Sequence, residues 1–92
     1  MDELSISGAA LRYEYVSDIL DRRGPLRDAH LALIRKTLDD GEMVMGGALG
    51  EPVHGAMFIF RDADDAQRFA QMDPYNQNGL VIRSEITPLQ PL

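Results

Sequence analysis

The sequence contains no cysteine, and this absence removes several kinds of site at once. A disulfide framework, a zinc site built on thiolates and thiol catalysis all need that residue. Positive charge is also scarce, with 9 Lys and Arg against 15 Asp and Glu and a formal net charge of −6. Because an acidic chain repels phosphate backbones, we expect no nucleic-acid partner.

Long apolar runs are missing as well. No stretch approaches the length of a membrane-spanning helix, and residues 1–13 lack the basic-then-apolar order of a signal peptide. We therefore expect a cytoplasmic protein with no membrane partner. The chain has 92 residues and 45% hydrophobic composition, which is typical of one globular domain. We expect that domain to span residues 1–92, with the polar stretch 1–8 as a loose arm.

Alternating hydrophobic residues predict four strands. They are expected over residues 11–16, 42–48, 56–60 and 80–87. The third is apolar on both faces, so we place it inside the sheet rather than at an edge. The fourth should carry Leu80, Ile82 and Ile86 on one side.

Two helices are predicted between these strands. The first runs from Leu26 to Asp40, after a short helical turn over 21–23 and a break at Gly24-Pro25. The second is capped by Asp62 and ends by Asp73, because the following proline disfavours helical geometry in the residue before it.

The resulting order is strand–helix–strand–strand–helix–strand. Two β-α-β halves around a central hairpin predict a ferredoxin-like α+β fold, with a four-stranded antiparallel sheet and two helices on one face. The other face is then uncovered. Because Tyr13, Met43 and Met45 would expose a large apolar patch there, we expect a homodimer joined through the sheet faces.

Two polar residues fall on the apolar side of the first helix. Arg27 and His30 are three residues apart, so their side chains are neighbours that face inward. A cation and an imidazole in that position need polar partners or a cleft. Asp73, which also faces inward, is a candidate partner for either residue, or a cap for the backbone.

Two interpretations of these residues stay open. In the first, Asp73 orients His30 as a general acid or base near neutral pH, and Arg27 holds an anionic or enolate oxygen. In the second, the same groups form a closed structural cluster. Tyr13 and Tyr75 either wall an aromatic pocket or simply pack.

The only other histidine is His54, in the loop over residues 50–55, where solvent exposure is expected. Two histidines so far apart in a chain without thiolates predict no metal site.

Several motifs together resemble the YciI-like family of YCII-related domains. They are Arg27-Asp-Ala-His30-Leu31, Gly46-Gly47, Phe58-Ile59-Phe60 and Asp73-Pro74-Tyr75. The resemblance covers Tyr13 to Pro88 and implies a dimeric α+β barrel. It also implies that His30 and Asp73 are active-site partners, and that Arg27 and Arg23 line the same pocket.

One branch of that family resembles a dehydrochlorinase that acts on a chlorinated hydroxyhydroquinone. The resemblance therefore implies proton transfer on a small oxygenated ring. We predict an acid–base enzyme of the lyase or isomerase type that needs no cofactor and acts on a small cyclic or enolisable compound. The catalytic residues would be His30 and Asp73, and the substrate-binding residues Arg27, Arg23, Tyr13 and Tyr75. The alternative is a non-catalytic dimer that binds a small anion or assists a partner enzyme.

Overall fold

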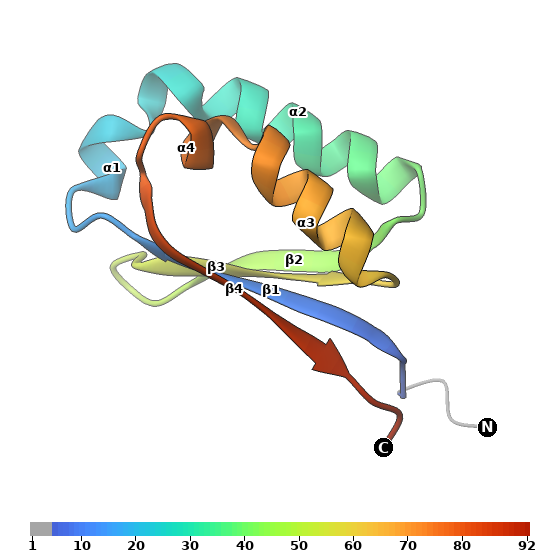
Figure 1. Cartoon of the computed structure of the whole chain (residues 1–92). Helices are drawn as coiled ribbons and strands as arrows, with labels where there is room; N and C mark the ends of the chain where they lie inside the picture. Colours follow the sequence, from blue (N-terminus) through green and yellow to red (C-terminus); the bar gives the residue numbers. More distant parts are fainter. Residues whose placement is uncertain (1–4) are drawn as a thin grey trace.

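The chain folds into one sheet with all of its helices on one side (Figure 1). A computed structural model describes residues 5–92. Its strands are β1 (Gly8–Tyr15), β2 (Met43–Leu49), β3 (Gly55–Phe60) and β4 (Val81–Leu89). Its helices are α1 (Ile19–Arg22), α2 (Gly24–Asp39), α3 (Ala63–Met72) and α4 (Pro74–Gln77).

The strand order is β2-β3-β1-β4, and every neighbouring pair is antiparallel. This arrangement confirms the predicted ferredoxin-like α+β fold, with β3 inside the sheet. The alternation of β1 is also confirmed, since Leu11, Tyr13 and Tyr15 are buried under the helices while Arg12 and Glu14 are exposed.

Helix α2 begins earlier than predicted, at Gly24 rather than Leu26. The break between α1 and α2 lies at Arg23 rather than at Gly24-Pro25, and Pro25 fits the first turn of α2, where its missing N–H has no partner to lose. The helix ends at Asp39, and Gly41 follows with a φ of 79°, a backbone conformation that favours glycine.

The segment after β3 follows the predicted capping chemistry. The Asp62 side chain accepts a hydrogen bond from the Asp64 backbone N–H at 2.7 Å and so caps α3. Buried Ala66, Phe69 and Ala70 turn one side of α3 to the sheet. The sequence did not predict the short helix α4 that follows.

The prediction that Tyr13, Met43 and Met45 all lie on the uncovered face of the sheet is wrong for the first two. Tyr13 and Met43 are 1% and 2% exposed and lie under the helices, whereas Met45 is 62% exposed. The register of β2 against β3 shifts between Met43 and Met45. Such an irregularity puts two residues of equal parity on opposite faces, which simple alternation does not anticipate.

The last strand departs from its predicted pattern for a similar reason. Leu80 lies before β4 and is buried, whereas Ile82 and Ile86 are 61% and 38% exposed. A register shift between Glu14 and Tyr15 of β1 interrupts the pairing with β4. The three apolar residues therefore do not share one buried side.

The loose arm predicted for residues 1–8 falls partly outside the described residues, which begin at residue 5. Residues 5–7 have no regular structure, and Gly8 already belongs to β1. Within residues 5–92, none of the helices combines the length and the hydrophobicity needed to cross a membrane.

Candidate active site

His30 is held rigidly on the inner side of α2. It is 5% exposed, and its ring stacks on the ring of Tyr75, with centroids 3.7 Å apart and an interplanar angle of 5°. Phe58 of β3 meets the imidazole edge-on at 6.4 Å. Aromatic neighbours on two sides leave the imidazole little freedom to rotate.

Asp73 lies between α3 and α4 and is fully buried. Its Oδ1 is 2.8 Å from His30 Nδ1 and also accepts the Tyr75 backbone N–H at 3.1 Å. Its Oδ2 accepts the hydroxyl of Tyr13 at 2.9 Å. A buried carboxylate needs such donors, and Asp73 both caps α4 and contacts His30.

The contact with Asp73 fixes which ring nitrogen of His30 carries the proton. An ionised carboxylate can only accept, so Nδ1 must donate to it. In the neutral ring, Nε2 then carries a free lone pair. Within residues 5–92 Nε2 has no hydrogen-bond partner, and His30 lines a cavity of about 240 Å³. The imidazole can therefore take a proton from a ligand in that cavity.

The cavity lies between α2 and strands β2 and β3. Two arginines, Arg23 and Arg27, contribute to its wall, and neither forms an ion pair with the residues that the structure describes. The helical position of Arg27 predicted an inward side chain, but the residue is exposed while it lines the cavity. A long arginine side chain can cover apolar surface and still keep its charged end in water. The other lining residues are Tyr15, His30, Leu31, Ile34, Gly46, Gly47, Ala48, Val53, Ala56, Phe58 and Tyr75.

The tyrosines occupy different places around this cavity. Tyr75 forms part of its wall, whereas Tyr13 is not among its lining residues and donates its hydroxyl to Asp73. Burial, followed by the charge of Asp73, raises the pKa of Tyr13 and of Tyr15. Burial also raises the pKa of Tyr75, although Arg23 and Arg27 oppose that shift. All three phenols stay protonated at neutral pH.

Strand β2 supplies a part of the wall that sequence reasoning did not assign. A Cβ atom on Gly46 would lie 2.8 Å from the Phe58 side chain, so only glycine allows β2 to run this close. The Gly46-Gly47 pair was the available signal, but two glycines do not reveal which side chain they approach. The bond between Tyr13 and Asp73 was also missed, since nothing local links residues 60 positions apart.

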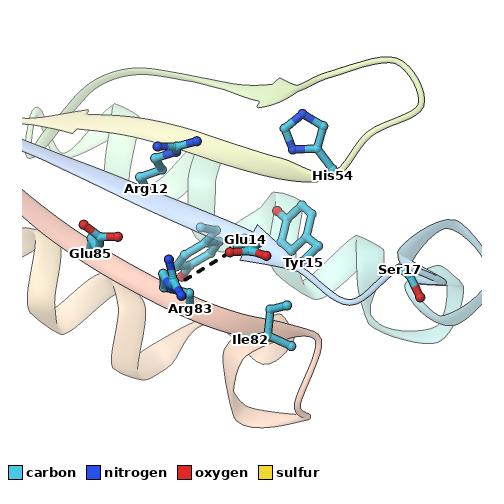
Figure 2. A pocket seen from close by; sticks show the side chains of 9 residues that line it. Arg12, Glu14, Tyr15, Ser17, His54, Ile82, Arg83 and Glu85 are labelled. Carbon is cyan, nitrogen blue, oxygen red and sulfur yellow. Dashed lines mark ion pairs between the residues drawn. The ribbon is translucent and has the colours of Figure 1, made fainter.

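A second hollow, of about 460 Å³, lies on the open face of the sheet (Figure 2). Its charged residues are exposed, and Arg83 approaches Glu14 at 4.0 Å. His54 stands exposed beside it, as predicted. Among residues 5–92, no three His, Asp or Glu side chains converge to hold a metal ion.

Comparisons with known proteins place this geometry in context. The sequence model of the YCII-related domain matches residues 9–90. No curated protein matches the chain by sequence. The fold is similar to 5-chloro-2-hydroxyhydroquinone dehydrochlorinase from Burkholderia phenoliruptrix AC1100, solved in complex with 2,5-dihydroxybenzoquinone (TM-score 0.73, 17% identity, 89% of this chain and 92% of that one). It is also similar to a NIPSNAP-like domain protein from Burkholderia xenovorans (TM-score 0.52, 16% identity, 91% and 83%).

Proposed function

The chain belongs to the family of YCII-related domains, and we propose that it is an acid–base enzyme that moves a proton on a small cyclic or enolisable compound without a cofactor. The supporting observation is the 2.8 Å contact between His30 Nδ1 and the buried carboxylate of Asp73. The contact occupies Nδ1, and Nε2 has no hydrogen-bond partner within residues 5–92, which supports a general base on a side chain that lines the cavity.

In the proposed reaction, Nε2 of His30 takes a proton from a carbon beside a carbonyl group. The electron pair of the broken C–H bond moves to the carbonyl oxygen, which becomes an enolate. Arg27 and Arg23 stabilise that negative oxygen, while Asp73 stabilises the imidazolium. The enolate then either recovers the proton at another carbon or expels a leaving anion, and in the second case His30 releases its proton to water.

The size and lining of the cavity favour a small ring. A volume of about 240 Å³ is below that of a drug-sized site, and most of the wall is apolar. The two guanidinium groups suit an oxygen anion on that ring. The dehydrochlorinase of similar fold was solved with a dihydroxybenzoquinone, and this supports an oxygenated ring as the substrate class here.

The proposal is tested with 2,5-dihydroxybenzoquinone as a probe, because its ring C–H protons are exchangeable. We expect the protein to accelerate their exchange with D₂O, measured by proton NMR. His30→Gln should slow that exchange by about 10²–10⁴-fold, the usual contribution of a general base. The matched control is His54→Gln, which should exchange at the wild-type rate. Equal rates for folded His30→Gln and the wild type would remove His30 from this role.

Arg23 and Arg27, which pair with no carboxylate among residues 5–92, also fit a non-catalytic protein that binds a small anion. The same experiment separates this second candidate from the first. Binding of the quinone, seen as a rise in melting temperature, without any acceleration of exchange would favour the binding protein and contradict the enzyme.

We further propose that two copies pair through their open sheet faces. One half of that face is apolar, with Met45 and Met57 62% and 36% exposed and Ile59 half-buried. The other half carries two cross-strand pairs of opposite charge, Arg12 with Glu85 and Glu14 with Arg83. A neutral surface of alternating charges can meet its own copy across a two-fold axis without net repulsion.

The dimer is tested by sedimentation velocity on Met57→Asp. We expect the wild type to be a dimer and this variant to be a monomer, because the new charge would be buried against the partner. Met72→Asp places the same charge on α3, at a methionine that is 52% exposed, and should stay dimeric. A monomeric wild type would overturn the proposal.

A further inference from the structure

The hydroxyl of Tyr13 makes a buried contact that the proposed reaction does not yet use. It donates to Asp73 Oδ2 at 2.9 Å, on the side of the carboxylate away from His30. Tyr13 is 1% exposed, and it is not among the residues that line the cavity. Its hydroxyl therefore has one visible partner, and that partner is the carboxylate that holds the catalytic imidazole.

The backbone and the ring of Tyr13 are both fixed. The residue lies in β1, which is paired on one side with β3 and on the other with β4. Its ring packs edge-on against Phe58 at 5.3 Å and tilted against Tyr15 at 6.0 Å. A hydroxyl carried on such a ring stays in one place, unlike one on a loop.

We infer that Tyr13 is a positioning residue that acts through Asp73: by holding Oδ2, it keeps Oδ1 aimed at His30 Nδ1 and so keeps the Nε2 lone pair in the cavity. This inference rests on the proposed function. Without the hydroxyl, Oδ2 would be a buried acceptor with no partner. The carboxylate could then turn about its Cβ–Cγ bond and loosen its hold on the imidazole.

The other polar groups around the pair do not supply this contact. The Tyr75 backbone N–H bonds to Oδ1, not Oδ2. Within residues 5–92, neither Tyr15 nor Arg23 donates a hydrogen bond to Asp73. Burial raises the pKa of Tyr13, so its hydroxyl keeps the proton that it donates.

The test uses ¹⁵N-labelled protein and reads the two histidines by NMR. In the wild type we expect His30 to be protonated on Nδ1, with a proton that exchanges slowly with water. Tyr13→Phe should accelerate that exchange at least tenfold and mix in the other tautomer. Thr37→Val removes a buried hydroxyl that donates only to the Leu33 carbonyl within α2, and it should leave the His30 signals unchanged. His54, exposed and distant, is the internal reference.

Unchanged His30 signals in folded Tyr13→Phe would overturn the inference. Should that variant not fold, the hydroxyl proton of Tyr13 in the wild type decides: it should exchange slowly, and exchange as fast as in free tyrosine would equally contradict the inference. Both measurements need no substrate, so they stand even if the enzyme proposal fails. With a substrate, Tyr13→Phe should lower kcat about 10–100-fold and leave KM within about threefold.

Discussion

The two histidines of this chain lie on opposite sides of one sheet and show what each side can do. His30, under the helices, is 5% exposed and meets a buried carboxylate at 2.8 Å. His54 is exposed in the loop that joins β2 to β3. The residue type is the same, but among the contacts of residues 5–92 only His30 has a partner that orients its ring and a wall that limits water.

The two hollows differ in the same way. The one on the open face is larger, about 460 Å³ against about 240 Å³, and it is lined by charges of both signs. In a single copy those charges are solvated and screened, so they exert weak forces on one another or on a ligand. The smaller cavity places two cations and an oriented imidazole beside apolar walls, where electrostatic forces are stronger.

The largest difference between the two faces should appear in stability. Asp73→Ala leaves three buried donors without an acceptor, so we expect a loss of about 3–5 kcal/mol in the free energy of unfolding. In a Met57→Asp background, which we expect to be monomeric, Glu85→Ala removes a solvated carboxylate from the open face and should cost less than about 1 kcal/mol. Urea denaturation measures both variants, and similar losses would contradict the distinction between the faces.

Alkaline pH should weaken the covered face. Burial raises the pKa of Tyr13 above its ordinary value of 10.0, so the folded protein keeps a proton that the unfolded chain loses. The stabilisation is complete below pH 10 and is lost as the pH rises beyond it, by about 1.4 kcal/mol per pH unit for each such tyrosine. Urea denaturation at several pH values above about 10 measures how steeply the free energy of unfolding falls with pH. Tyr13→Phe should make that fall shallower by about 1.4 kcal/mol per pH unit, the contribution of one tyrosine. A slope equal to the wild type's would argue that this phenol ionises normally in the folded state.

Most of the fold could be predicted from the sequence because the features that indicate it act between residues that are close along the chain. Alternation along β1, the cap at Asp62 and the Gly41 stop each act within a few residues. The errors fell where pairing overrides alternation. At Met43 and Met45 a register shift changes which face each side chain joins, and only the neighbouring strand determines such a shift.

The site was only partly readable for the same reason. The helical position of His30 and the inward position of Asp73 could be read separately, and the family resemblance suggested that they pair. Alternation put Tyr13 on the same side of β1 as Leu11 and Tyr15, but we expected Tyr13 on the uncovered face. Nor could the sequence place its hydroxyl opposite one oxygen of a carboxylate 60 residues away. Contacts across three elements depend on how the helices dock, which residue spacing does not encode.

Removing one guanidinium from the cavity should have a moderate effect. We expect Arg27→Gln to weaken binding of 2,5-dihydroxybenzoquinone about tenfold, because one charge-assisted hydrogen bond to an anionic oxygen is lost. Arg12→Gln removes the same charge from the open face and should bind as the wild type does. Calorimetric titration measures both, and equal weakening would mean that only overall charge attracts the ligand.

The smallest effect belongs to the ion pair on the open face. Arg83 and Glu14 are 4.0 Å apart, with side chains 69% and 52% exposed. In a Met57→Asp background, which we expect to be monomeric, a double-mutant cycle of Glu14→Ala and Arg83→Ala should give a coupling below about 1 kcal/mol. Repeating the cycle without Met57→Asp tests whether a second copy covers this face, because a copy that excludes water would raise the coupling energy of the pair. Equal couplings in dimer and monomer would mean that water still reaches this pair, and that any contact between copies lies elsewhere on the surface.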